Sequence, residues 1–330
     1  MAQPTPLDNS TTTPIYTLPN TPSTFTAVYT GKGTSPKNDN YSFHRPKPTQ
    51  DDDDADPRAT LFTTNITQLC RTLSINPQNL TWPNGAWPHS GTVIKTDEHD
   101  WIRSPTTHGL VPVSRDAART PVSFDGVVTR SGSHEFVLAV QSADCSSIFL
   151  WDEQAGVIGL VHAGWKPLVR GVVGNAVRAM EELGARKERV GAYVSPGVGD
   201  RYFEFGWDGK MEEGIREVFV GAGREDLLTD EGVRGEMSME DRRTLNAVSG
   251  RDVERPGMTF KLSVLTVREL EKYGVRRERI AMAECSTLLD RYEDGEGAGQ
   301  FRYHSYRRES PDHGLSMSVI FIKPGPESSS

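Results

Sequence analysis

The sequence has few cysteines, no excess of positive charge and no long apolar run. Its three cysteines, Cys70, Cys145 and Cys285, are too widely spaced for a disulfide framework, so a reducing compartment fits best. A net charge of -8 gives no general attraction to nucleic acid or anionic membranes. No apolar run approaches the roughly 18 residues that a membrane span needs, and no basic secretory signal opens the chain. We therefore expect a cytoplasmic protein that binds neither nucleic acid nor membrane.

The low hydrophobic content, 35%, with 21 prolines and 31 glycines, indicates that part of the chain lies outside a packed core. Residues 1–25 are rich in Ser, Thr and Pro and show no apolar periodicity. We expect a disordered tail at 1–50, a single domain at 51–323 and a short tail at 324–330. Residues 207–258 carry many charges and little regular apolar pattern, which predicts a surface insert in this domain.

Short runs of β-branched and aromatic residues, bounded by turn residues, predict the strands of a sheet. They fall at 127–128, 135–141, 148–151, 157–162, 190–195, 280–284 and 317–323. Amphipathic spacing predicts helices at 61–73, 172–183 and 263–273, whereas residues 81–105 show no regular pattern. No internal repeat is expected. The strand, helix, strand order in the centre favours an α/β fold, with a mixed sheet flanked by helices.

Two side chains that suit a transition metal lie at the ends of one predicted hairpin. Cys145 enters the first strand and His162 ends the second, so a turn centred between Glu153 and Gln154 would place them opposite each other. A slip of one residue would move one of them to the other face of the sheet. A thiolate and an imidazole suit zinc or copper rather than magnesium or calcium.

A catalytic zinc site needs about three protein ligands, so a third must come from another segment. His108 lies in the short polar turn TTHG ahead of the predicted sheet, and we expect it to be this ligand. His44, His89 and His99 lie in segments that look loosely structured, and His134 starts a strand on its own.

The segment from Ala143 to Gly171 resembles the YfiH-type laccase-domain family, whose pattern is ADC followed by HAGWRG. The segments FDGVVT, SPGVGDRYFEFG, HSYRRES and TTHG resemble further motifs of this family, so the similarity covers roughly residues 51–322 apart from the insert. This chain has Lys166-Pro167 where the family has Arg-Gly. The resemblance implies an α/β sandwich that is not a Rossmann fold, with metal ligands at His108, Cys145 and His162.

The resemblance also implies phosphorolysis of purine nucleosides, namely adenosine, inosine, guanosine and methylthioadenosine, and deamination of adenosine. The cofactor would be zinc, with copper able to occupy the same site, and the partners would be a purine nucleoside and phosphate. A zinc-bound water is acidic enough to supply a nucleophile for deamination. We expect a catalytic centre of Cys145, His162 and Asp144, with Lys166, Arg307, Arg308 and Glu204 around the substrate. Purely structural roles for the residues outside the Cys145–His162 pair stay open.

Three other functions are compatible with the sequence. Multicopper oxidases need more histidine ligands than the eight present in this chain, in part as H-x-H pairs that it lacks, so a laccase-like polyphenol oxidase would have to use one copper ion. Cys145 and His162 could instead act as the nucleophile and base of a hydrolase or amidase. A relative without enzymatic activity could use the acidic insert at 207–258 to bind a partner.

Overall fold

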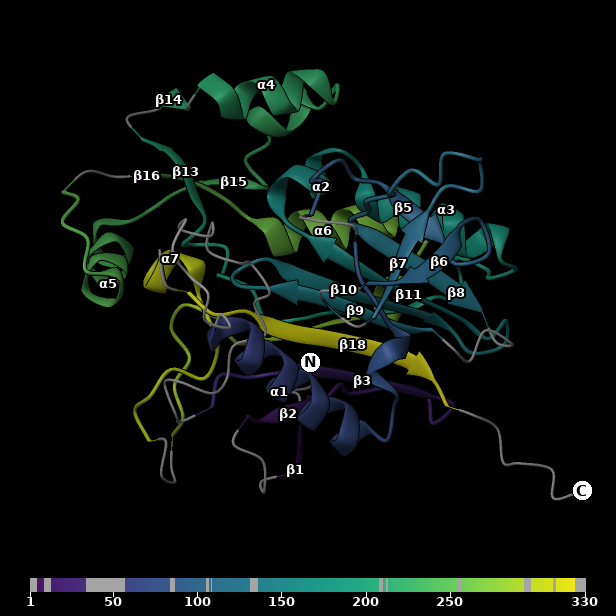
Figure 1. Cartoon of the computed structure of the whole chain (residues 1–330). Helices are drawn as coiled ribbons and strands as arrows, with labels where there is room; N and C mark the ends of the chain where they lie inside the picture. Colours follow the sequence, from purple (N-terminus) through teal and green to yellow (C-terminus); the bar gives the residue numbers. More distant parts are fainter. Residues whose placement is uncertain are drawn as a thin grey trace, which may run out of the picture.

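The computed structural model describes residues 5–8, 13–33, 57–83, 87–104, 107, 109–130, 136–207, 210–211, 213–254, 257–293, 298–310 and 313–323. Two large sheets form its centre, and helices lie on their outer faces (Figure 1). Antiparallel and parallel pairs occur together in both sheets. The expected mixed α/β fold is confirmed, and the strand order is not that of a Rossmann fold.

The strands belong to three sheets, in each of which neighbouring strands are hydrogen-bonded in a fixed spatial order. The eight-stranded sheet runs from β1 (Thr5–Asp8) through β2 (Ile15–Thr17), β3 (Phe25–Thr30), β18 (Ser316–Ile322), β9 (Val137–Ser142), β4 (Leu80–Thr81) and β7 (Leu110–Val113) to β6 (Asp100–Arg103). The six-stranded sheet runs from β17 (Ile280–Met282) through β12 (Gly191–Val194), β10 (Ser146–Asp152), β11 (Val157–Ala163) and β8 (Gly126–Arg130) to β5 (Val93–Lys95). The four-stranded sheet runs from β14 (Lys210–Met211) through β13 (Glu204–Trp207) and β16 (Gly257–Phe260) to β15 (Arg234–Glu236).

Seven α-helices accompany the sheets in the described part of the chain. They are α1 (Pro57–Leu73), α2 (Trp165–Val169), α3 (Val172–Glu182), α4 (Glu213–Gly221), α5 (Met239–Ser249), α6 (Leu262–Lys272) and α7 (Tyr306–Glu309). Short 3₁₀ turns lie at Pro77–Asn79, Glu225–Leu228 and Arg277–Arg279. Among the described residues, no helix is both long and apolar enough to cross a membrane.

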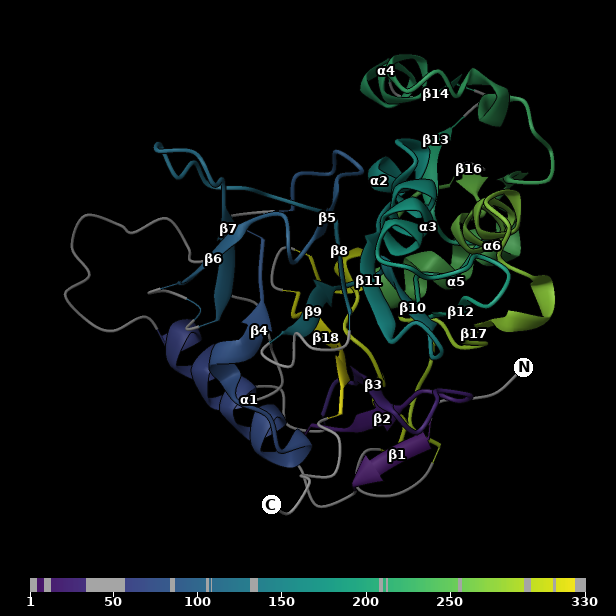
Figure 2. The same cartoon turned by 90° about the vertical axis from the view of Figure 1, so that its right-hand side faces the viewer.

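The core has four layers, which Figure 2 shows from one side. Helices α3 and α6 cover one face of the six-stranded sheet, where α3 buries Val173, Val177 and Met180. The other face packs on the eight-stranded sheet, and α1 covers the far side of that second sheet. Alternation along β18 explains this stacking, because Val319 packs with α1 while its neighbour Ile320 packs between the sheets.

The expectation of a disordered tail at 1–50 was wrong over residues 5–8, which form β1, and over residues 13–33. Strand β3 pairs antiparallel with β18, and Phe25, Val28 and Tyr29 are buried. The composition of this segment hides the strands, because the few apolar residues stand among Thr and Pro and their partner strand lies at the far end of the chain. Residues 34–50 lie outside the described residues.

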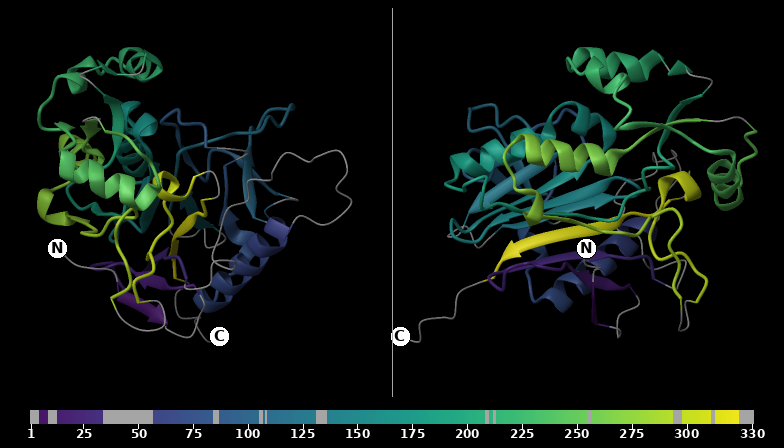
Figure 3. Two further views of the ribbon diagram at one scale, coloured as in Figure 1. Left: turned by 90° about the vertical axis from the view of Figure 1, so that its left-hand side faces the viewer. Right: turned by 180° about the vertical axis from the view of Figure 1, so that it is seen from behind.

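The segment at 207–258 is folded more fully than its charge pattern suggests. It supplies α4, α5 and most of the four-stranded sheet, and Phe219, Leu227 and Phe260 around it join the same buried cluster as α3 and α6. Helix α4 stands outside the two-sheet body (Figure 3). Residues 81–105, for which no regular structure was expected, contain β5 and β6. The division into domains stays a prediction.

The structure also reveals a repeat, although none was expected from the sequence. Helix α3 leads into β12 and helix α6 leads into β17, and the two strands are parallel neighbours. Each helix is followed, two residues after its last residue, by a glycine with positive φ, 98° at Gly184 and 92° at Gly274. The following N–H donates to the carbonyl five residues earlier over 3.0 Å in both cases, which is the Schellman arrangement. The segments ELGARKERV (182–190) and KYGVRRERI (272–280) then align without a gap, and they share one glycine, two arginines and one glutamate at the same positions.

Candidate metal centre

Strands β10 and β11 form the predicted hairpin, but the predicted register was wrong by two residues. Ser147, not Cys145, lies opposite His162. The turn has four residues, because the Asp152 carboxylate accepts backbone N–H groups of the turn and Gly156 adopts a φ of 62°. A shift of two keeps side chains on the same face of a sheet, so the argument that the thiol and the imidazole share one side survives the error.

Gly164 is the residue that lets Cys145 and His162 meet. A Cβ atom at this position would lie 3.3 Å from Cys145 Sγ and 3.4 Å from His162 Nε2, so both groups border the space that the glycine leaves empty. Cys145 also lies close enough to His162 to raise the pKa of the imidazole. His162 is buried and Cys145 is half-buried. The predicted proximity of these two residues is therefore present in the structure.

Asp125 lies beside Nδ1 of His162. Its Oδ1 atom is 3.9 Å from His162 Nδ1, an ion-pair distance that is too long for a hydrogen bond. The Asp125 carboxylate also accepts the backbone N–H of His89 over 3.0 Å and that of Gly91 over 2.8 Å. This fully buried carboxylate thus fixes the His162 ring and the segment at 89–91 together.

The electrostatics of the site favour positive charge at His162. Burial lowers the pKa of His162, but the Asp125 carboxylate and the Cys145 side chain raise it by more, to about 9. Burial raises the pKa of Asp125, while His162 and the N–H donors of Gly91 and His89 lower it by more. The same negative groups that stabilise protonated His162 would also stabilise a metal cation bound between Cys145 and His162.

His89 is a functional candidate that sequence reasoning missed. Its ring centroid lies 5.6 Å from that of His162, and ligand atoms of His89, Asp125 and His162 lie within 4.8 Å of one another. Burial and then the charge of His162 lower the pKa of His89, which favours the neutral form that binds metals. The parallel pairing of β5 with β8 brings this histidine to Asp125. The sequence signal was the short run TVI that follows Gly91, too short to predict a strand.

His108, the expected third ligand, lies outside the described residues, so its role stays a prediction. The catalytic assignment of Asp144 is also untested, but the structure shows what this residue holds. Its backbone has a φ of 73°, and its carboxylate accepts the Thr287 hydroxyl over 2.6 Å and the backbone N–H of Arg307 over 2.7 Å. Asp144 therefore joins the turn before Cys145 to the start of α7.

The two arginines of α7 are placed differently. Arg308 donates to the carbonyls of Thr287, Leu288 and Tyr303 and to Glu309, so its guanidinium is fully engaged in buried structure. Among the described residues, the Arg307 guanidinium makes one hydrogen bond, of 3.3 Å to the Glu204 carbonyl, and it lies 5.5 Å from the Phe203 ring centroid. Burial lowers the pKa of Arg307, and Asp144 opposes this effect.

The remaining predicted substrate residues lie in two places. The Glu204 carboxylate binds both terminal nitrogens of Arg242 in a buried ion pair, so it already has a partner. Lys166 lies at the start of α2 with its Nζ 5.5 Å from the Trp165 ring centroid, and its charge reaches His89. Trp165 itself stacks on Phe219.

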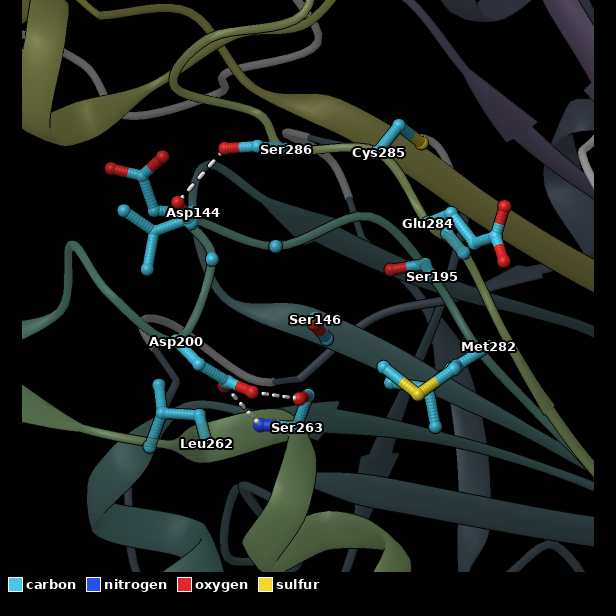
Figure 4. Close-up of a pocket in the computed structure, with 15 residues that line it drawn as sticks. Asp144, Ser146, Ser195, Asp200, Leu262, Ser263, Met282, Glu284, Cys285 and Ser286 are labelled. Carbon is cyan, nitrogen blue, oxygen red and sulfur yellow. Dashed lines mark hydrogen bonds between the residues drawn. The ribbon is translucent and has the colours of Figure 1, made fainter. Parts of the chain in front are cut away.

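A cavity of about 230 Å³ adjoins Asp144 at the carboxyl ends of the parallel strands β12 and β17 (Figure 4). Asp200, Glu284 and Ser146 line it, and Asp200 is bonded to the backbone and hydroxyl of Ser263 at the start of α6. None of the described lining residues is a lysine or an arginine. The cavity therefore suits a ligand with hydroxyl groups better than an anion.

Comparison with known proteins places this geometry in a family. The family model described as "Multi-copper polyphenol oxidoreductase laccase" matches residues 49–323. A protein of Deinococcus radiodurans named purine nucleoside phosphorylase is 38% identical over 221 residues, which are 67% of this chain and 70% of that protein. Purine nucleoside phosphorylase ORF3 of Streptomyces griseus is 37% identical over 141 residues, 42% of this chain and 49% of that one.

Solved structures show the same fold at low sequence identity. YlmD from Geobacillus stearothermophilus superposes with a TM-score of 0.64 at 17% identity, over 97% of this chain and 100% of that one. YfiH of Bacillus licheniformis gives a TM-score of 0.62 at 16% identity, over 95% of this chain and 98% of that one. The expected resemblance to YfiH-type proteins is confirmed, and the chain belongs to the multi-copper polyphenol oxidoreductase laccase family.

Proposed function

We propose that this protein is a zinc-dependent purine nucleoside phosphorylase that also deaminates adenosine. The observation that carries the proposal is the cluster of His89, Asp125 and His162, with Cys145 beside His162 at the end of the β10–β11 hairpin. The relative from Deinococcus radiodurans that is named purine nucleoside phosphorylase supports the reaction class. A shorter match, 37% over 82 residues, to a protein named adenosine deaminase RL5 from an unknown prokaryotic organism supports the second activity.

The donor set fits zinc, with copper as the other ion that the same ligands accept. Two imidazoles and one thiolate are the ligand types of catalytic zinc sites, which keep a fourth position open. We assign the ligands to His89, Cys145 and His162, with His108 as the alternative to His89. Asp125, beside Nδ1 of His162, would orient the ring so that Nε2 faces the ion. When bound, zinc would act as a Lewis acid and make a coordinated water more acidic.

Other side chains would bind the phosphate and the sugar and position Cys145. Arg307 is the arginine of α7 whose guanidinium has donors to spare among the described residues, so Arg307 would bind the phosphate. Lys166, whose charge lowers the pKa of His89, is the second cation that we propose for the phosphate. Arg308 would support the turn instead, since its donors are engaged. The cavity beside Asp144 offers the carboxylates of Asp200 and Glu284 to sugar hydroxyls. Asp144 would position Cys145 rather than move a proton, because both its oxygens already accept hydrogen bonds.

The test combines metal analysis with chromatography of adenosine incubated with and without phosphate. Adenine that forms only with phosphate supports phosphorolysis, and inosine supports deamination. A zinc-loaded sample that yields neither product contradicts the proposed function. Cys145→Ala, His162→Ala and His89→Ala should each lose the metal, while the control His99→Ala, outside the cluster, should retain it. Loss of metal in His108→Ala but not in His89→Ala would assign the third ligand to His108.

The second candidate function is a cysteine hydrolase or amidase, and one observation favours it. Cys145, His162 and Asp125 stand in the order thiol, imidazole, carboxylate, which is the order of a nucleophile, a base and an orienting acid. The thiol alkylating agent iodoacetamide separates the two functions. A chelated, metal-free protein that still hydrolyses an amide and is inactivated by alkylation of Cys145 supports the hydrolase, whereas activity that returns only with zinc supports the metal site.

A further inference from the structure

The two repeated units carry a pair of arginines at matching positions of the loop. Among the described residues, a carboxylate binds only the first pair. In the first unit, buried Asp152 accepts the backbone N–H of Arg186 over 2.9 Å. The same carboxylate binds the guanidinium of Arg189 through Nε and Nη2, over 3.0 Å and 2.8 Å. Asp152 ends β10, the strand beside β12, so the neighbouring strand supplies the anion.

In the second unit, Arg276 and Arg279 stand at the matching positions. In this unit the neighbouring strand is β12, and the loop that precedes it offers a backbone carbonyl instead of a carboxylate: Arg279 Nη1 donates to the Arg189 oxygen over 3.1 Å. The other nitrogens of the Arg279 guanidinium bind no protein group among the described residues, and neither the backbone N–H nor the guanidinium of Arg276 has an acceptor there. The second arginine pair thus lacks the negative charge that completes the first.

A cavity of about 430 Å³ lies where that charge is missing. Arg276, Arg279, Asn20 and Trp151 line it, and Glu278 is the single carboxylate among the described lining residues. The Trp151 ring lies against Gly191, where a Cβ would clash with the indole, and only 6% of Trp151 is exposed. Two arginines and a tryptophan therefore line the same cavity.

We propose that this cavity binds an oxyanion, the carboxylate or phosphoryl group of a small organic ligand. Arg276 and Arg279 hold the anion as Arg186 and Arg189 hold Asp152, and the rest of the ligand lies against Trp151. Planar guanidinium groups bind such oxyanions through paired charge-assisted hydrogen bonds. The cavity is at the opposite end of β10 from Cys145, a strand length of roughly 20 Å away, so it is separate from the candidate metal centre.

The test is an NMR titration of the full-length protein with sodium succinate and, separately, with inorganic phosphate. The indole N–H signal of Trp151, assigned from Trp151→Phe, is the readout, because it reports this cavity and not binding at the metal centre. We expect a saturable shift with at least one probe. Arg279→Gln should weaken that affinity about tenfold or more, as expected for a hydrogen bond to a charged group. Arg276→Gln keeps the backbone N–H and should weaken the affinity less.

Two further variants make the result specific. Arg277→Gln is the matched control, because Arg277 belongs to the same turn but donates to the Ile280 carbonyl, and its affinity should stay that of the wild type. Asn20→Asp should weaken binding by placing a negative charge in the cavity. A response to succinate alone identifies a carboxylate site, and a response to phosphate alone identifies a phosphoryl site. No shift with either anion up to tens of millimolar, or wild-type affinity in Arg279→Gln, would overturn the proposal.

Discussion

Two units of the fold share a helix end, a loop and a strand start: α3 with β12, and α6 with β17. Their loops nevertheless pack against different parts of the protein. The first loop lies beside the end of β10 and is closed by Asp152, whereas the second lies at the edge of the sheet and borders a cavity. The difference shows that the position of a unit in the sheet, rather than its own sequence, decides whether an arginine serves structure or stays available to a ligand.

The largest effect should come from removing the carboxylate that closes the first loop. Asp152→Ala should lower the free energy of unfolding by about 2–4 kcal/mol, because the Arg186 N–H and the Arg189 guanidinium lose a buried acceptor. Arg279→Ala in the second unit should cost less than about 0.5 kcal/mol, since this exposed side chain makes one bond to a carbonyl. Urea denaturation measures both values. An equal loss in the free energy of unfolding for the two variants would contradict a structural role for the first loop that the second loop lacks.

The second largest effect on stability should come from the contact between α3 and the end of α6. A Cβ at Gly174 of α3 would overlap the Tyr273 ring at the end of α6, so Gly174→Ala should cost about 1–3 kcal/mol. Gly214→Ala in α4 is the control, because nothing lies within 4 Å of its Cβ position and it should stabilise the protein by about 0.5–1 kcal/mol. Thermal and urea unfolding of the two variants should move in opposite directions. A neutral Gly174→Ala would mean that the units are packed less tightly than the structure shows.

The two helix ends should respond alike. Gly184→Ala and Gly274→Ala should each cost about 1 kcal/mol, because both positions require a positive φ that alanine adopts poorly. The cost at Gly274 should be slightly larger, since its Cβ would also meet the Lys187 side chain, while the Cβ position at Gly184 is open. Chemical denaturation of both variants tests whether the caps are equivalent. A large cost at one cap and none at the other would contradict the equivalence.

The smallest effect is a local response to acid. Burial raises the pKa of Asp152, but Arg189 and the N–H donors of the loop lower it by more, so the folded value lies below the unfolded one. The stabilisation is therefore complete above about pH 4, the ordinary pKa of an aspartate, and is lost as the pH falls through the folded value. Hydrogen exchange, corrected for intrinsic rates, should show the Arg186 amide losing protection in acid. The Arg279 amide and the Asp152→Asn variant serve as controls and should show no such dependence.

Local periodicity predicted the centre of the fold well. The strands at 126–163 and the helices α3 and α6 follow from patterns that a few neighbouring residues carry. The meeting of Cys145 and His162 was also predicted, because a hairpin is a local structure and its side chains alternate with a period of two. The error of two residues in the register came from the turn, where Asp152 holds a longer loop than assumed.

Features that depend on distant pairing were missed. His89 reaches the site because β5 pairs in parallel with β8, a contact that no spacing near this histidine reveals. Strands β2 and β3 are stable because β18 lies beside them, not because of their own composition. The repeated unit escaped notice because its shared residues are few and scattered, and the shared geometry of Gly184 and Gly274 made them visible.

The pairing of β3 with β18 has a consequence for biosynthesis. Residues 25–30 leave the ribosome long before their partner at 316–322, so this part of the eight-stranded sheet cannot assemble until β18 has been made. Contacts between segments so far apart in sequence slow folding. Until β18 arrives, the nascent chain carries a strand with an open edge, which is a surface that other chains can join. Shielding of this edge during synthesis is therefore a requirement of the fold.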